Sequence, residues 1–117
     1  MSARKVLIVE DDYLIASHLA VAIQCDGFTV VGPVDTAGSA VRRIDEEALD
    51  GALLDVRLRE GSAVDVARAL RAHGVPFVIV SGYSRDTLPT ELKDVPYIGK
   101  PMGQSELIRT ARDTFKA

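Results

Sequence analysis

The sequence predicts an α/β protein in which helices cover both faces of a parallel five-stranded sheet. Short apolar runs alternate with amphipathic segments of helical period along the whole chain. The apolar runs are continuous, which is typical of strands buried on both faces, as in a parallel sheet. The chain has 117 residues, 47% hydrophobic and 26% charged, which suits a single globular domain. Right-handed crossovers between parallel strands then produce three layers.

Five apolar runs mark the expected strands of this sheet. In chain order they are "VLIV" at 6–9, "FTVV" at 28–31, "ALL" at 52–54, "FVIV" at 77–80 and "YI" at 97–98. The helical segments lie between them, so each strand except the first is reached through a crossover connection.

Four amphipathic segments mark clear helices, at 13–25, 36–48, 62–73 and 104–115. In the first, Ile15, Leu19 and Ile23 share one face. Asp12 can cap its N-terminus and Gly27 can end it. The inward residues of the other three segments are expected to be Ala37, Val41, Ile44 and Ala48, then Ala63, Val66, Ala67 and Leu70, and finally Leu107, Ile108, Ala111 and Phe115.

The connection between the fourth and fifth strands, "SGYSRDTLPTELKDVPYIGK", predicts a short fourth helix. Proline disrupts a helix interior but is tolerated at a first helical position, so a helix can begin only near Pro89. Pro96 stops it before the fifth strand. We therefore expect a weakly held helix at about 89–94 behind an extended loop at 82–88, with apolar anchors at Leu88, Leu92 and Val95.

Polar side chains follow the strands that should line one edge of the sheet. Glu10 and Asp11 follow the first strand, Asp55 the third, Ser81 the fourth and Lys100 the fifth. The carboxyl ends of parallel strands form the ligand-binding edge of such sheets. Three carboxylates beside one ammonium leave an excess charge that a divalent cation would balance, and oxygen ligands without His or Cys favour Mg²⁺. A carboxylate beside Mg²⁺, with an amine and a hydroxyl nearby, is suited to receive a phosphoryl group.

The pieces "VLIVEDD", "LLDVRL", "VSG" and "KP", in this order and at these spacings, resemble the receiver domains of two-component response regulators. The resemblance spans nearly the whole chain. The segments "PFVIVSGY" and "VPYIGKP" are similar to a branch of stand-alone receivers common in alphaproteobacteria. The resemblance implies a flavodoxin-like (βα)5 fold with strand order 2-1-3-4-5, here with a short or irregular fourth helix.

The resemblance also implies a metal site and a phosphoacceptor. Asp55 would accept the phosphoryl group and contact Mg²⁺. Asp11 would bind Mg²⁺ directly, Glu10 would bind it through a water molecule, and the backbone carbonyl of Arg57 would be a further ligand.

Further roles follow from the resemblance for the ends of the last two strands. Ser81 would hydrogen-bond a phosphoryl oxygen and Lys100 would pair with one. Tyr97 stands where the family has an aromatic residue that rotates on phosphorylation, and Lys100-Pro101 resembles the family's cis peptide bond. Arg57 and Tyr83, each two residues beyond a site residue, are bulky, and we expect them to shield the phosphoryl group from water.

The expected function is that of a single-domain response regulator, residues 1–117, without an output domain. It would take its phosphoryl group from a histidine kinase or a histidine phosphotransfer protein. It would then signal by docking to an unidentified downstream protein or by onward phosphotransfer. It would not be an enzyme, beyond its own phosphorylation and slow dephosphorylation.

Composition bears on location and partners. The net charge of −3 argues against a nucleic-acid partner. There is no apolar run before Val6 and none of transmembrane length, which argues against a membrane. The single cysteine, Cys25, fits a reducing compartment, so we expect a cytoplasmic protein.

The same residues bear on other function classes. A small Mg²⁺-dependent phosphoryl-transfer enzyme would need a base or a second aspartate near Asp55, where "LLDVRL" has Val56 and Arg57. A flavin or nucleotide binder would need a glycine-rich first loop, whereas "VEDDYL" has three acids and no glycine. A docking-only receiver is a third alternative, although every site residue is present. The acids after the first strand could also simply favour a helix N-terminus.

Overall fold

The computed structural model describes residues 4–115, so the first three residues of the polar N-terminal segment lie outside it. Five strands form one parallel sheet in the order β2-β1-β3-β4-β5, which confirms the predicted strand order. The strands are β1 (Lys5–Val9), β2 (Thr29–Val34), β3 (Gly51–Leu54), β4 (Phe77–Ser81) and β5 (Tyr97–Gly99).

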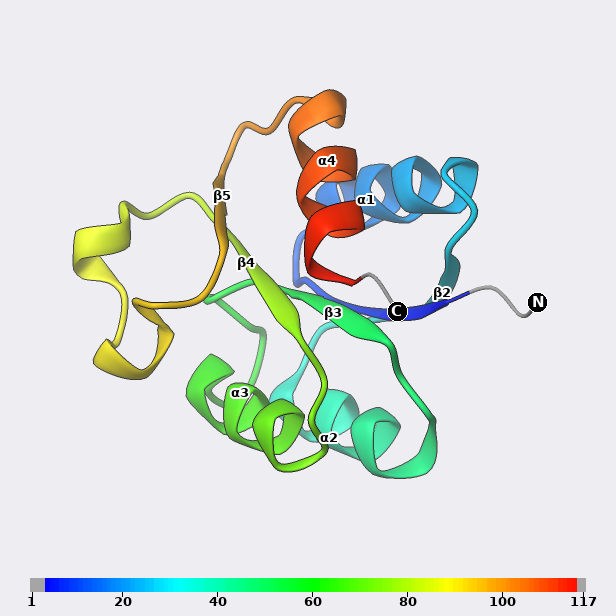
Figure 1. Ribbon diagram of the computed structural model, residues 1–117. Coiled ribbons are helices and arrows are strands. Elements are labelled where there is room, and N and C mark those ends of the chain that lie inside the picture. Colours follow the sequence, from blue (N-terminus) through cyan, green and yellow to red (C-terminus); the bar gives the residue numbers. More distant parts are fainter. Residues whose placement is uncertain (1–3, 116–117) are drawn as a thin grey trace.

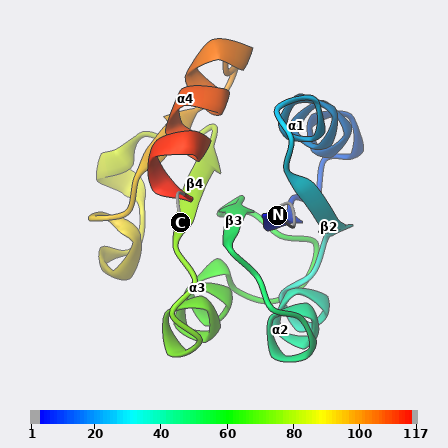
Figure 2. The ribbon, with the colours of Figure 1, turned by 45° about the vertical axis from the view of Figure 1, so that its right-hand side comes forward.

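Four α-helices complete the three layers. They are α1 (Tyr13–Cys25), α2 (Ala37–Glu46), α3 (Ala63–Ala72) and α4 (Gln104–Thr114). The two views agree that α1 and α4 cover one face of the sheet while α2 and α3 cover the other (Figures 1 and 2). Within residues 4–115, no helix is both long and apolar enough to cross a membrane.

The helix boundaries follow local capping chemistry. As predicted, the Asp12 carboxylate caps α1 by accepting hydrogen bonds from the backbone amides of Leu14, at 3.0 Å, and Ile15, at 3.1 Å. The predicted segment 36–48 is longer than α2, because the chain turns extended at Glu47 (φ −121°, ψ 148°) to return to the sheet. Ala48, expected on the inner face of this helix, therefore lies outside it and is exposed.

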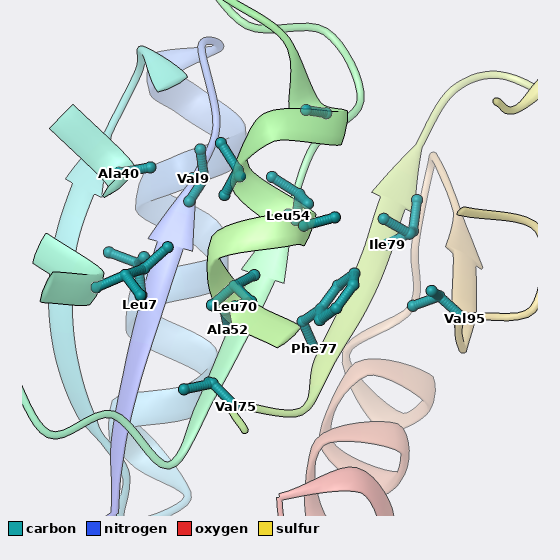
Figure 3. Close-up of a cluster of buried hydrophobic side chains, with 14 of the residues drawn as sticks. Leu7, Val9, Ala40, Ala52, Leu54, Leu70, Val75, Phe77, Ile79 and Val95 are labelled. Atoms are coloured by element: carbon teal, nitrogen blue, oxygen red, sulfur yellow. The ribbon is translucent and has the colours of Figure 1, made fainter. Parts of the chain in front are cut away.

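The core has two halves because the sheet is covered on both faces. Leu7 and Val9 of β1 point toward α2 and α3, whereas Val6 and Ile8 point toward α1 and α4. Figure 3 shows the first half, where Leu54, Phe77 and Ile79 from neighbouring strands meet Leu70 from α3. Every residue of β3 and β4 is buried. This two-sided burial explains why the apolar runs do not alternate with polar residues.

The connection between β4 and β5 differs from the prediction. In place of an extended loop at 82–88 and a helix at 89–94, it has two 3₁₀ turns, Arg85–Thr87 and Thr90–Leu92. They are the yellow turns at the left of Figure 1. The second turn begins directly after Pro89, where the short helix was predicted to start, but it is a single 3₁₀ turn. The first turn lies within the loop that was predicted to be extended.

Apolar anchors and one arginine hold this connection in place. The predicted anchors are buried, with exposed fractions of 4%, 0% and 7% for Leu88, Leu92 and Val95. The guanidinium of Arg85 donates to the backbone carbonyls of Lys93, at 2.7 Å, and Val95, at 3.0 Å. A side chain thus satisfies carbonyl groups that a longer helix would have bonded internally.

Candidate functional site

Three carboxylates meet at the carboxyl end of the sheet. Glu10 and Asp11 follow β1, and Asp55 follows β3, whose last residue, Leu54, pairs with Val9 of β1. One carboxylate oxygen from each of the three acids lies within 4.8 Å of the others. Glu10 and Asp55 are 3% and 4% exposed, whereas Asp11 faces solvent. The parallel register therefore converts positions 45 residues apart in the chain into one acidic cluster.

Lys100, directly after β5, brings a positive charge into this cluster. Its Nζ lies 2.8 Å from Oε1 of Glu10 and 3.4 Å from Oδ2 of Asp55. Oε1 of Glu10 is buried, and its contact with the Lys100 ammonium is an ion pair. Burial disfavours the charge on Lys100, but the two carboxylates outweigh it and raise the pKa of the ammonium.

The positive charge of Lys100 does not balance the negative charge of the three carboxylates, and the raised pKa of Glu10 indicates this. Burial, followed by the hydrogen bond to Asp55, raises the pKa of Glu10 from 4.5 to about 7. Lys100 and the backbone amide of Asp12, which donates to Oε2 at 3.2 Å, oppose this rise only in part. A crowded set of carboxylate oxygens with surplus negative charge fits a hard divalent cation such as Mg²⁺.

A solvent-open cleft of about 560 Å³ gives access to Asp55. The backbone amide of Arg57 donates to Oδ1 of Asp55 at 3.3 Å, which turns the loop after β3 back toward the site. The guanidinium of Arg57 lies 5.9 Å from the centre of the Tyr83 ring. The cleft is lined by Asp11, Asp12, Asp55, Arg57, Gly82, Tyr83 and Lys100.

Ser81 ends β4 at the same edge but is fully buried and does not line the cleft. Its hydroxyl accepts a hydrogen bond from the backbone amide of Tyr83 at 3.0 Å, and its carbonyl accepts one from the amide of Lys100 at 2.8 Å. The hydroxyl keeps its own proton free to donate. The peptide bond between Lys100 and Pro101 is cis, as the resemblance implied, and so is Gly32-Pro33, which was not predicted.

Tyr97 connects β5 to the loop after β4. Its hydroxyl donates to the carbonyl of Tyr83 and lies 3.5 Å from the carbonyl of Ser81. The guanidinium of Arg85 lies 5.1 Å from the centre of its ring. Sequence reasoning missed Arg85, because an arginine in a polar, proline-interrupted loop belongs to no periodic pattern.

Comparisons with known proteins show the family to which the chain belongs. The family model described as the response regulator receiver domain matches residues 6–112. The transcriptional regulatory protein PdtaR of Mycobacterium tuberculosis (strain H37Rv) is 28% identical over 109 residues, which cover 90% of this chain and 53% of that protein. The DNA-binding response regulator MtrA of the same strain is 34% identical over 116 residues, covering 93% and 49%. The chain thus spans about half the length of these curated relatives.

Solved structures share the fold. The solution structure of SdrG from Sphingomonas melonis Fr1 is 37% identical with a TM-score of 0.82, and the match covers 93% of this chain and 94% of that one. The receiver domain of the sensor histidine kinase PA1611 from Pseudomonas aeruginosa PAO1 is 21% identical with a TM-score of 0.82, covering 99% and 100%. That crystal structure has a magnesium ion coordinated in its active site cleft.

Proposed function

Since the chain belongs to the response regulator receiver family, we propose that it is a signalling domain that accepts a phosphoryl group on Asp55. The observation that carries the proposal is the meeting of Asp55 with Glu10, Asp11 and Lys100 at the carboxyl end of the sheet. No other aspartate in the described part of the chain belongs to such a cluster, except Asp11.

The proposed step is an in-line transfer from a phosphorylated histidine. A carboxylate oxygen of Asp55 attacks the phosphorus atom and forms an O–P bond, while the N–P bond breaks and the histidine nitrogen leaves with the electron pair. The open cleft admits the donor from solvent. Asp55 is almost fully buried, which fixes the orientation of its side chain toward the donor. The product is an acyl phosphate on Asp55 and a histidine that takes a proton from water.

Nearby side chains would hold the transferred group. The Nζ of Lys100, 3.4 Å from Asp55, can shift from Glu10 to a phosphoryl oxygen, and the Ser81 hydroxyl can donate to another. A bound Mg²⁺ would supply the positive charge that the acids and the incoming phosphoryl oxygens lack. Glu10, Asp11, Asp55 and the carbonyl of Arg57 are the groups proposed to hold it.

The proposed donor is a histidine kinase or a histidine phosphotransfer protein. Apolar side chains on α1 support docking of a protein beside the acceptor, since Tyr13 and Leu14, at the start of the helix, are 82% and 70% exposed. An apolar groove of about 690 Å³ continues from there between α1 and α4 and reaches Lys100. A donor helix seated here would bring its histidine to the cleft.

The proposed output is protein–protein interaction of the phosphorylated form, or onward transfer of the phosphoryl group. Beyond its own phosphorylation and slow dephosphorylation, we propose no catalytic turnover. The downstream protein would recognise the segment that phosphorylation changes. The connection from β4 to β5 is the best candidate, because its Tyr83 is hydrogen-bonded to both Ser81 and Tyr97.

Intact-mass measurement with acetyl phosphate tests the proposal. We expect the wild-type protein to gain one phosphoryl group when Mg²⁺ is present and none when it is chelated. Asp55→Asn should abolish the gain, whereas Asp113→Asn, on the exposed side of α4, should leave it intact. Equal labelling of wild type and Asp55→Asn would refute the assignment, and steady release of phosphate from small phosphoesters would favour an enzyme instead.

A further inference from the structure

The segment 34–37, which runs from the last residue of β2 to the first residue of α2, is hydrogen-bonded to two loops of the proposed site. On one side the carbonyl of Val34 accepts a hydrogen bond from the backbone amide of Glu10 at 2.9 Å. On the other side the carbonyl of Asp35 accepts one from the amide of Arg59, also at 2.9 Å. The segment 34–37 therefore links the end of β1, which carries the first acids, to the loop after β3, which carries Arg57.

Further backbone contacts fix the register between this segment and the loop after β3. The amide of Ala37 donates to the carbonyl of Glu60 at 2.9 Å, and Thr36 and Glu60 form an isolated parallel bridge. Gly61 has φ +84°, and a Cβ added there would lie 2.5 Å from the Cβ of Ala37. Only glycine allows the two backbones to approach this closely, so the pairing is built into the chain.

Arg59 closes the same junction from the solvent side through ion pairs with Asp35 and with Glu60, whose Oε2 accepts from Nη1 of Arg59 at 3.4 Å. The Nε of Arg59 donates to Oδ2 of Asp35 at 2.9 Å. The side chains are 60% and 48% exposed, so the pair contributes little to overall stability. The ion pair between Asp35 and Arg59 acts on the geometry of the junction, because it joins two side chains at the point where the two backbones already pair.

The loop after β3 is consequently held at both ends. Near β3 the amide of Arg57 donates to Asp55, and two residues later Arg59 is fastened to Asp35. The carbonyl of Arg57 lies within this span. We propose that Asp35 and Arg59 are positioning residues that hold the Arg57 backbone in register with the acids after β1. This inference rests on the proposed function, since it concerns the affinity of the same site for Mg²⁺.

Charge and positioning make opposite predictions for Arg59. If these residues acted only through their charge, Arg59→Ala would remove a positive charge and tighten Mg²⁺ binding, while Asp35→Ala would weaken it. If they position the loop, both substitutions weaken binding, and the double variant is no weaker than either single one. Removing a residue that supports a metal ligand typically lowers the affinity for the metal about tenfold or more. Because this pair is exposed, we expect its loss to lower the affinity for Mg²⁺ about threefold to tenfold.

Calorimetric titration of the metal-free full chain with MgCl₂, at constant ionic strength, tests the inference. Arg68→Ala is the matched control, because Arg68 is 66% exposed and pairs with Glu91 at 3.3 Å away from the site. We expect the control to bind Mg²⁺ like wild type. Hydrogen exchange at the amides of Ala37 and of position 59 should accelerate in Arg59→Ala, relative to the intrinsic rate of each amide, while the urea midpoint of the metal-free protein stays nearly constant.

The outcomes separate the two proposals. Unchanged or tighter Mg²⁺ binding by Arg59→Ala, with normal binding by wild type, would overturn the positioning role and leave the proposed function standing. Opposite effects of the Asp35 and Arg59 substitutions would also overturn it in favour of simple charge. Failure of the wild-type protein itself to bind Mg²⁺ would overturn the proposed function and this inference together.

Discussion

Replacing Glu10 by glutamine should stabilise the metal-free protein at neutral and alkaline pH. Burial and the neighbouring Asp55 raise the pKa of Glu10 from 4.5 to about 7, so the folded protein holds this proton more tightly than the unfolded chain does. The stability that this protonated carboxyl contributes is fully present below pH 4.5 and is lost as the pH rises through about 7. Glutamine imitates the protonated acid at every pH and avoids this loss.

The size of the effect follows from the pKa change. A rise from 4.5 to about 7, at about 1.4 kcal/mol per pKa unit, corresponds to about 3 kcal/mol. The Glu10 side chain is fully buried, so solvent screening reduces this only modestly. Local relaxation around the carboxylate reduces it further, and we expect Glu10→Gln to gain about 2 kcal/mol above pH 7. The gain should nearly vanish below pH 4.5.

Urea unfolding followed by circular dichroism, in chelator and across pH 4–8, measures this effect in a chain that lacks tryptophan. Glu46→Gln, on the exposed end of α2, is the control and should change stability by less than about 0.5 kcal/mol. Adding Mg²⁺ should stabilise the wild-type protein more than Glu10→Gln, and so narrow the difference in unfolding free energy between them. A variant less stable than wild type at pH 8 without metal, or a difference that does not change with pH, would refute the reasoning.

Two further predictions concern the phosphorylated form. Arg57 and Tyr83 line the cleft and lie against each other, so Arg57→Ala combined with Tyr83→Ala should hydrolyse its acyl phosphate faster than wild type, by about tenfold if the pair excludes water. Loss of phosphate followed by intact mass measures this, and an unchanged lifetime would end the shielding hypothesis. Hydrogen exchange over 82–95 should change when beryllofluoride occupies Asp55, because the amide of Tyr83 is bonded to the Ser81 hydroxyl and its carbonyl to Tyr97. Identical exchange in the two states would mean that this segment is not the switch.

Much of the fold could be read from the sequence because periodicity reports burial directly. The runs at 6–9 and 77–80 are apolar at every position, and a strand covered on both faces requires just that. Capping also acts over a few residues, which is why Asp12 was predictable as the start of α1. The acids, hydroxyl and amine at the strand ends could be grouped because parallel strands end at one edge.

Other features depend on contacts between distant segments and leave no local pattern. The connection from β4 to β5 was expected to hold one short helix, but Arg85 bonds the carbonyls of Lys93 and Val95 and stabilises two 3₁₀ turns instead. The link from Asp35 to Arg59 joins loops that are 24 residues apart. In the sequence, nothing around Arg59 or Arg85 distinguishes either one from any other charged residue in a polar loop.

By itself, then, the sequence determined the layers, the strand edge and the chemical groups that gather there, because hydrophobic period and residue type are local properties. Only the tertiary structure decided how those groups interact. It pairs Lys100 with Glu10 at 2.8 Å, closer than with Asp55 at 3.4 Å, and it buries Glu10 so that its pKa rises to about 7. Burial and distance depend on how all five strands and their loops pack, and the free energy of a charge depends on both.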